Sequence, residues 1–369
     1  MYIQVSYKKQ IIVFLILFVL LLFAVEIGAR VIEYSGENKC EFIGKDAFKN
    51  VEIIKQNQIC EDSNSIMYEV DGILKFIPNQ NMETININSH GFRGHDFSEK
   101  KDLDTYRIFI VGGSTIFGSG ATSDDTTIPS FLQKKFEAIH SDQKIEILNA
   151  GIGSAYSYSE KYLIENYLIK FQPDLIIIYS GGNDANNRYG VEYTVPGLPI
   201  SQLTQYVEQT DFVGSVKKFI KEIDYRSPFV LMKIYKGMEQ NFTPSESTTN
   251  QVQELWTTRM GEICKTNNDV GIKTIILVQP MLGSGNKQLS IDEKILSENL
   301  GIYMVDTLDI LNKISGSLAK LENICHETYD LRMILDDVKE PLFYDHIHVT
   351  DLGNEIIAEE IYKILTDYL

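Results

Sequence analysis

Apolar and polar positions along this chain predict a parallel β-sheet that is covered by helices. From Tyr106 onward, short apolar runs of strand length are separated by longer segments with helical periodicity, which is typical of α/β folds with helices on both faces. The predicted strands are 107–111, 144–148, 175–179, 273–278 and 301–305. The predicted helices are 128–139, 157–171, 252–267, 291–299 and 352–366. We therefore expect an α/β domain with a five-stranded parallel sheet.

The first thirty residues have a different pattern, an unbroken apolar run from Ile11 to Val25 that follows Lys8 and Lys9. Residues 10–30 are predicted to form a transmembrane anchor, with Glu26 near the membrane interface. A cleaved signal peptide is the alternative, but no Ala-x-Ala site follows the run. The lysines place residues 1–9 in the cytoplasm as a short N-terminus and the remaining chain outside it.

The rest of the chain divides into three parts. Residues 31–104 are polar with short apolar stretches, and we expect a small juxtamembrane extension with a few short strands. Within it, Phe92 and Arg93 belong to a turn that packs on the main domain. Residues 105–369 hold the α/β pattern, interrupted by an insertion at about 185–250 without regular strands. A segment of that length is a lid, a substrate platform, or a surface facing the membrane or a partner.

Composition and charge exclude some classes of function. The hydrophobic content of 44% is ordinary for a folded core, and the formal net charge of −17 argues against nucleic acid and anionic lipid surfaces as partners. Four cysteines, an even number, suit a non-reducing compartment. Pairing Cys40 with Cys60 and Cys264 with Cys325 would be economical, but sequence leaves the connectivity open and free buried thiols are the alternative. The absence of a Cys-x-x-Cys motif argues against zinc.

Gly112-Gly113-Ser114-Thr115 follows the first predicted strand and places a serine where open α/β sheets bind ligands. Ser114 is therefore a candidate nucleophile. A phosphate-binding Walker loop is excluded because no lysine precedes a serine or threonine at its end. An α/β-hydrolase elbow would need glycine where Ile116 stands. A plain tight turn remains the alternative for this stretch taken alone.

Three further polar clusters follow predicted strands. They are Asn149-Ala150-Gly151-Ile152-Gly153-Ser154, Gly181-Gly182-Asn183-Asp184 and Asp345-His346-Ile347-His348. Since a serine needs a base whose orientation a carboxylate fixes, His348 and Asp345 are the candidates for those two roles. The amide of Ser114, an amide from the bend at Gly153 and Ser154, and the Asn183 side chain could stabilise an oxyanion.

Each cluster has a simpler interpretation. Asp345 and His348 could be a helix N-cap and a surface histidine. Asp345, His346 and His348 could instead bind a metal, but the chain offers no second cluster of ligands after a strand. The glycine-rich clusters could be turns. Because all of these clusters fall at the same edge of the predicted sheet, each after a different strand and in strand order, we favour a catalytic site without metal or cofactor.

Together these blocks resemble those of the SGNH, or GDSL-like, hydrolase family, from about Tyr106 to the C-terminus. The resemblance implies a flavodoxin-like three-layer α/β/α sandwich. It also implies that Ser114 is the nucleophile, Asn183 an oxyanion donor, and Asp345 and His348 the rest of the triad. An N-terminal anchor, an Asn-x-x-Gly-Phe-Arg-like segment and then Gly-Gly-Ser-Thr are familiar among exported members.

The sequence departs from the family pattern in two places. Gly113 and Thr115 replace the Asp and Leu of Gly-Asp-Ser-Leu, which keeps the nucleophile but changes how its loop is braced. In the second block, the position of the oxyanion glycine falls on Ser154 rather than Gly153. An amide can donate from either residue, but serine is less free in its dihedral angles.

The predicted function is that of a membrane-anchored serine esterase that works through an acyl-serine intermediate. Its expected substrate is an acylated small molecule, glycan or lipid ester, with O-acetyl groups on an extracytoplasmic glycan as the first candidate. An O-acyltransferase would use the same triad with a sugar hydroxyl in place of water. A glycan-binding or scaffolding domain without turnover is the non-enzymatic alternative.

Overall fold

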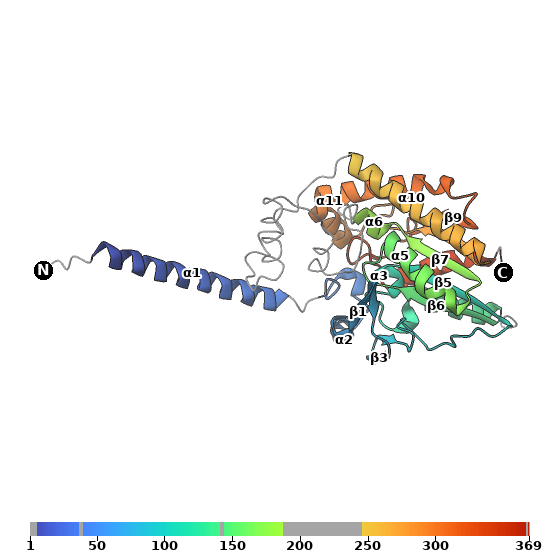
Figure 1. Ribbon diagram of the computed structural model, residues 1–369, viewed down its shortest axis with the longest axis horizontal. Helices are drawn as coiled ribbons and strands as arrows, with labels where there is room; N and C mark the ends of the chain where they lie inside the picture. The colour runs from blue at the N-terminus through green and yellow to red at the C-terminus, as the bar shows by residue number, and fades with distance from the viewer. Residues whose placement is uncertain (1–5, 37–39, 141–143, 187–245, 367, 369) are drawn as a thin grey trace. The chain divides into compact units, whose positions relative to one another are not determined.

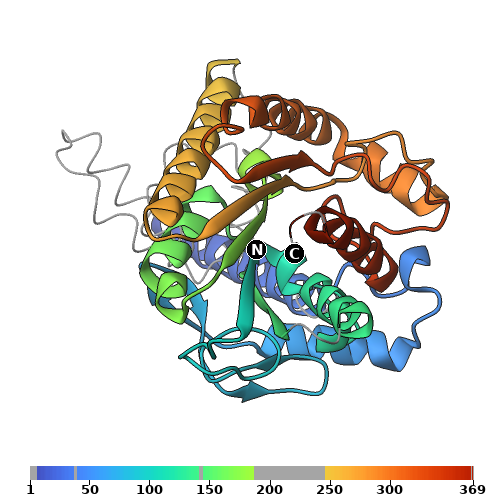
Figure 2. The ribbon, with the colours of Figure 1, turned by 90° about the vertical axis from the view of Figure 1, so that its right-hand side faces the viewer.

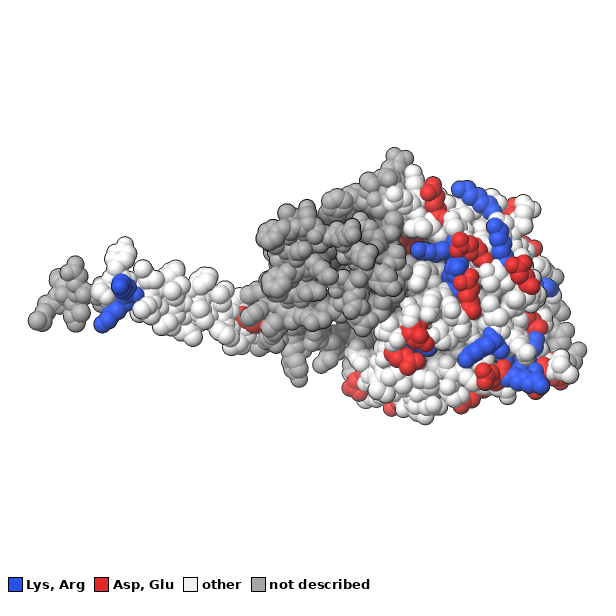
Figure 3. All heavy atoms as spheres, in the orientation of Figure 1, with Lys and Arg blue, Asp and Glu red and all other residues white. Residues whose placement is uncertain are grey.

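The computed structural model describes residues 6–36, 40–140, 144–186, 246–366 and 368 (Figure 1). Two compact units can be distinguished, and among the described residues the first consists of helix α1 (Tyr7–Gly36). Its segment Tyr7–Gly28 is long and apolar enough to cross a membrane, a test that a signal sequence would also pass. Figure 3 shows the long uncharged surface along this helix. The helix continues through residues 31–36, which were predicted to belong to the extension.

The second unit begins at Cys40 and contains a five-stranded parallel sheet. Its strands are β5 (Thr105–Gly112), β6 (Lys144–Gly151), β7 (Leu175–Ser180), β8 (Lys273–Val278) and β9 (Glu327–Asp330). The order β6-β5-β7-β8-β9 is that of flavodoxin-like sheets, in which the chain reverses direction across the sheet beside the first strand. The predicted fold class is confirmed.

Helices cover both faces of this sheet. They are α4 (Ile128–Ile139), α5 (Ser157–Leu163), α10 (Glu246–Asp269), α11 (Ile291–Gly316) and α12 (Asp351–Thr366). Because side chains alternate along a strand, Ile108 and Ile110 of β5 pack with α4 and α12, while Phe109 and Val111 pack with α5 and α10. Figure 2 shows α4 and α12 together on one face. The predicted helix 157–171 is present, but after α5 it continues as a π-helical and a 3₁₀ segment.

The predicted strand at 301–305 is wrong, because these residues lie inside α11. Met304, Thr307 and Leu311 are buried while Val305 is exposed, which is the spacing of a helix with one buried face. A short apolar run does not distinguish a buried strand from a buried helical segment. Gly301, with φ 49° and ψ −126°, interrupts the helix two residues after its predicted end at 299.

The fifth strand of the sheet is β9, and its sequence Glu-Thr-Tyr-Asp carries no apolar run. It pairs only with β8 and therefore lies at the edge of the sheet. None of its residues is fully buried. An edge strand of this kind lacks the hydrophobic signal that identified the other four strands.

The extension is a folded part of the second unit. Its elements are η1 (Asp46–Phe48), α2 (Ile53–Ser65), β1 (Tyr68–Asp71), β2 (Ile73–Phe76), β3 (Gln80–Asn81) and β4 (Asn86–Ile87). Phe76 and Phe92 are buried in the same core as the α5 face of the sheet. The short strands and the packed turn at Phe92 and Arg93 are present as predicted. A smaller, separate cluster of extension residues, Phe42, Phe48, Ile59 and Cys60, packs with Tyr344.

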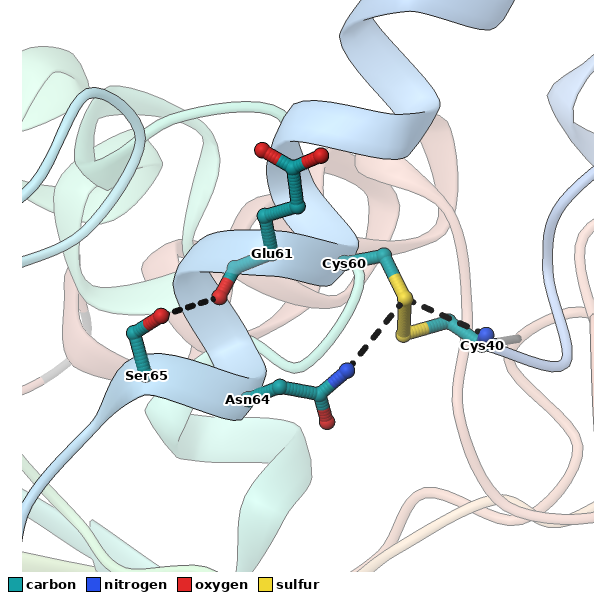
Figure 4. The surroundings of a disulfide bond; sticks show 5 residues. All are labelled: Cys40, Cys60, Glu61, Asn64 and Ser65. Atoms are coloured by element: carbon teal, nitrogen blue, oxygen red, sulfur yellow. Dashed lines mark hydrogen bonds between the residues drawn. A yellow bond between two sulfur atoms is a disulfide. The ribbon is translucent and has the colours of Figure 1, made fainter. Parts of the chain in front are cut away.

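Two disulfides are present, Cys40–Cys60 and Cys264–Cys325, and no cysteine is free. These are the pairings that the sequence indicated as the economical ones. The first ties the start of the extension to α2 (Figure 4), where the backbone amide of Cys40 and the side chain of Asn64 are directed at the sulfur of Cys60. The second joins α10 to the loop before β9. Both suit a non-reducing compartment.

Candidate active site

Ser114 is the first residue of a one-turn helix, α3 (Ser114–Phe117), that begins directly after β5. In the sheet, Gly112 lies opposite Gly151 of β6, so the two strands end at the same level. A Cβ atom on Gly151 would lie 2.0 Å from the backbone nitrogen of Phe117. Glycine at this position therefore lets α3 rest directly on the backbone of β6, which fixes the start of the helix at the sheet edge.

The structure brings Ser114 together with Asp345 and His348, which lie more than two hundred positions later in the chain. Ser114 Oγ lies 2.6 Å from His348 Nε2, and His348 Nδ1 lies 2.6 Å from Asp345 Oδ2. The other oxygen of Asp345 accepts hydrogen bonds from the backbone amides of Ile347, at 2.8 Å, and His348, at 2.7 Å. These two amides thus hold the carboxylate in place independently of its contact with the imidazole ring.

The environment of Asp345 favours its charged form. Burial acts to raise the pKa of this carboxyl, but the facing His348 and the backbone amides lower it more, so its pKa lies below the ordinary value. An ionised carboxylate at this position accepts the Nδ1 hydrogen of His348, which leaves Nε2 as an acceptor toward Ser114.

The predicted oxyanion donors lie around the same serine. Asn183, on α6 (Gly182–Asn186), donates through Nδ2 to the carbonyl of Ala155 at 2.7 Å. A Cβ atom on Gly113 would lie 2.3 Å from that same nitrogen, so Asn183 packs against the residue that precedes Ser114. Ser154 adopts a left-handed φ of 60° in the bend before Ala155. Asn183 and this bend therefore both border the start of α3.

His346 lies apart from this arrangement. Its ring packs edge-on against Tyr303 at 5.8 Å, and its buried Nε2 has no hydrogen-bond partner in the described part of the chain. His348 is engaged by Asp345 and Ser114 instead. Among the described residues, no group of three His, Cys, Asp or Glu side chains could hold a metal ion.

Tyr344 is a neighbour of the site that the sequence did not single out. Its ring stacks on that of His348, with centroids 5.6 Å apart and planes within 8°, and its hydroxyl donates to the carbonyl of Ser119 at 2.9 Å. Phe42 and Phe48 of the extension pack edge-on with the same Tyr344 ring. The extension thus supports the residue that holds the histidine ring.

A buried polar network holds Asp184, the residue that follows Asn183, and the sequence did not predict it either. Asp184 accepts hydrogen bonds from the hydroxyl of Ser157, at 2.5 Å, and from its amide, at 3.0 Å, while Arg259 donates to the same hydroxyl. Glu160 is fully buried nearby, and burial followed by the charge of Asp184 raises its pKa well above the usual range. The network joins the start of α5 to α6. Because its members lie on three different helices, no motif in the sequence marked the network as a whole. Only Asp184 belonged to a predicted cluster, Gly-Gly-Asn-Asp.

The insertion predicted at 185–250 lies almost entirely outside the described residues. Its role as lid, platform or surface stays a prediction.

Comparison with known proteins adds one family match. The family model of the GDSL-like lipase/acylhydrolases matches residues 108–361. No curated protein sequence matches the chain. Similar solved structures include the acetyl xylan esterase AlAXEase, at 14% identity over 70% of this chain and 99% of that one, with a TM-score of 0.41. Another is a catalytic mutant of Axe2, an acetylxylan esterase from Geobacillus stearothermophilus, at 12% identity over 70% and 93%, with a TM-score of 0.38.

Proposed function

The chain belongs to the GDSL-like lipase/acylhydrolase family and is a serine ester hydrolase, and from this premise we propose that Ser114, His348 and Asp345 form its catalytic triad. The observation that carries the proposal is the continuous pair of 2.6 Å contacts from Ser114 Oγ through the His348 ring to Asp345. Nucleophile, base and orienting carboxylate are thereby in hydrogen-bond reach of each other.

In the proposed reaction, Ser114 Oγ attacks the ester carbonyl while its proton passes to His348 Nε2. Asp345 stabilises the imidazolium that forms. The tetrahedral intermediate then expels the alcohol, which takes the proton from Nε2, and leaves an acyl group on Ser114. Water repeats the sequence with the same proton transfers and releases the carboxylic acid. The protein's own residues perform every proton transfer in this scheme.

The oxyanion donors in this proposal are the amide of Ser114, an amide from the bend at Gly153 and Ser154, and the side chain of Asn183. Within the described part of the chain, the backbone amides of Ser114, Gly153 and Ser154 have no hydrogen-bond partner. One N–H of the Asn183 amide is held by Ala155, which fixes the group and leaves its second N–H free to donate. Fixed donors of this kind stabilise developing charge without reorganisation.

Replacing Asn183 by alanine is expected to lower kcat by about 10²- to 10³-fold with little change in KM, since one oxyanion donor is lost. Gly113→Ala is expected to have a similar effect, because its methyl group would displace the Asn183 amide. In the double variant the two losses should not add, because both act on the same donor. The measurement is steady-state ester hydrolysis by the single and double variants.

Gly316→Ala serves as the control in that series, since a Cβ atom there meets no heavy atom within 4 Å. Full activity of Asn183→Ala would remove this residue from the oxyanion site. Additive losses in the double variant would show instead that Gly113→Ala disturbs Ser114 directly.

For location and substrate, we propose a single-pass anchor with the N-terminus in the cytoplasm and the catalytic domain outside, acting on O-acyl groups of a glycan or other ester. The apolar segment of α1, the preceding Lys8 and Lys9, and the two disulfides support this orientation. The proteins AlAXEase and Axe2 are named as acetyl xylan esterases, and O-acetyl groups are the substrate to test first.

The test uses the full chain in detergent with p-nitrophenyl acetate, butyrate and octanoate and with acetylated xylan. We expect faster turnover of the acetyl ester than of the octanoyl ester and release of free acetate from the glycan. Preference for octanoate would overturn the O-acetyl proposal in favour of a lipid ester. Mass spectrometry with an added oligosaccharide separates the two enzyme classes, because acetyl transfer to the sugar in place of free acetate would identify an acyltransferase.

A further inference from the structure

Arg93, in the extension, is almost completely buried and directs its guanidinium group at the far end of α3. Its Nη1 donates to the carbonyls of Phe117, at 3.2 Å, and Gly118, at 2.8 Å, which are the carbonyls that end this helix. Its Nε pairs with Asp124 at 2.7 Å, and its Nη2 donates to the carbonyl of Thr84 at 2.9 Å. One side chain thus joins the extension, the loop after α3 and α3 itself.

The backbone of Arg93 explains how the side chain reaches this place. Arg93 forms antiparallel bridges with Ile87 on one side and with Asn149 of β6 on the other, so the turn continues the sheet beyond its β6 edge. The side chain of Asn149 donates to the carbonyl of Ile116 at 2.9 Å. Arg93 and Asn149, which face each other in this bridge, therefore both bind the carbonyl end of the helix that starts with Ser114.

Packing around α3 leaves it little freedom to shift. The Phe117 ring packs against both the Arg93 guanidinium, 5.0 Å from its centroid, and the ring of Phe76 from the extension, 4.8 Å away. A Cβ atom on Gly118 would lie 3.2 Å from Arg93 Nη1 and 2.6 Å from a methyl carbon of Thr127. A helix of one turn has no interior hydrogen-bond ladder of its own, so its position depends on such external contacts.

We propose that Arg93 is a positioning residue for the nucleophile, which acts on Ser114 through α3 and makes the extension a working part of the active site. This inference rests on the proposed catalytic role of Ser114. Its physical basis is that Oγ and the amide of Ser114 belong to the first residue of α3. A shift of the carbonyl end of a one-turn helix therefore moves both groups relative to His348 and Asn183, and small misplacements of reacting groups cost large factors in rate.

The chain offers a matched control in Arg107, which is also buried and also binds the extension, but at the opposite end of β5. Its guanidinium pairs with Glu146 and donates to the carbonyls of Phe171, Ser98 and Glu99. Arg93→Lys and Arg107→Lys each remove a planar group that serves several acceptors and keep the positive charge. Both variants are expected to lower the unfolding temperature, and only the first should disturb Ser114.

The experiment measures the rate constant for labelling of Ser114 by a fluorophosphonate, together with kcat and KM for p-nitrophenyl acetate, in the full chain in detergent. Arg93→Lys is expected to lower the labelling rate and kcat at least tenfold with KM within twofold of the wild type. Arg107→Lys should keep all three within twofold. Labelling of folded Arg93→Lys at the wild-type rate, or an equal loss in Arg107→Lys, would overturn the inference.

Asp124→Asn provides a second variant in case Arg93→Lys does not fold. It replaces the acceptor of Arg93 Nε with a side chain of the same shape, and we expect labelling to fall at least fivefold. A change below twofold counts against the inference. Failure of the proposed function gives a different result, because the wild type would then label no faster than Ser114→Ala.

Discussion

Replacing Ser114 by alanine is expected to abolish fluorophosphonate labelling and to lower ester hydrolysis by about 10⁵-fold or more, to a residual rate set by the oxyanion donors. The side chain is the only one placed 2.6 Å from His348 Nε2 in the described site. Intact-mass measurement of labelled full-length protein, alongside hydrolysis of p-nitrophenyl acetate, checks both parts of the expectation.

Stability should change little in this variant, by about 1 kcal/mol, because one partly exposed hydrogen bond is lost. Ser119→Ala is the matched control: it lies just beyond α3, and among the described residues its hydroxyl makes no hydrogen bond. His348→Ala should match Ser114→Ala in activity, whereas His140→Ala, whose ring binds Tyr362, should not. Wild-type hydrolysis by folded Ser114→Ala would remove the triad from the mechanism.

The fold was predictable to the extent that burial leaves a pattern in the sequence. The strands β5, β6, β7 and β8 are apolar along most of their length because helices cover both faces of the sheet, and each was placed within a few residues of its observed bounds. The edge strand Glu327–Asp330 has one neighbour and half-buried polar side chains, so no apolar run marked it. The apolar run at 301–305 was predicted as a strand, but its buried positions have the spacing of a helix that restarts after Gly301.

The proposed site could be predicted where a glycine-rich segment follows the end of a predicted strand. A parallel sheet brings its carboxyl ends to one edge, so Ser114 and Asn183 could be placed together before any distance was known. Tyr344 and Arg93 could not be assigned their contacts in this way. Phe42 and Tyr344 are three hundred residues apart, and the bonds from Arg93 to α3 depend on a pairing of two residues beside β6. Such contacts depend on tertiary packing and have no period along the chain.

Asp345→Asn is expected to lower kcat by about 10³- to 10⁴-fold with little change in KM. In the variant, Oδ1 can still accept from the amides of Ile347 and His348, which keeps the loop in place. The new amide would face His348 Nδ1 and donate to it, so the ring would carry its hydrogen on Nε2. That nitrogen could then no longer accept the proton of Ser114, although the three side chains keep their positions.

The pH dependence of stability gives an independent check. Because the pKa of Asp345 is lowered in the folded protein, its charge contributes stability above its unfolded pKa of about 3.9. This contribution is lost as pH falls through the folded value. The difference in free energy of unfolding between wild type and Asp345→Asn should therefore be largest near pH 7 and shrink below about pH 4. Denaturant unfolding at several pH values measures it.

Asp336→Asn is the control for both measurements, since Asp336 also accepts a backbone hydrogen bond, from Asn286 at 2.7 Å, but lies in the loop after β9 and, among the described residues, makes no hydrogen bond to His348. It should keep wild-type activity. If Asp345→Asn also retained most of its kcat, the carboxylate would serve only to hold the loop through its Oδ1 contacts, and His348 would not need Asp345 to act as the base. A loss confined to Asp345→Asn requires instead that the ionised oxygen facing Nδ1 sets the proton position on the ring.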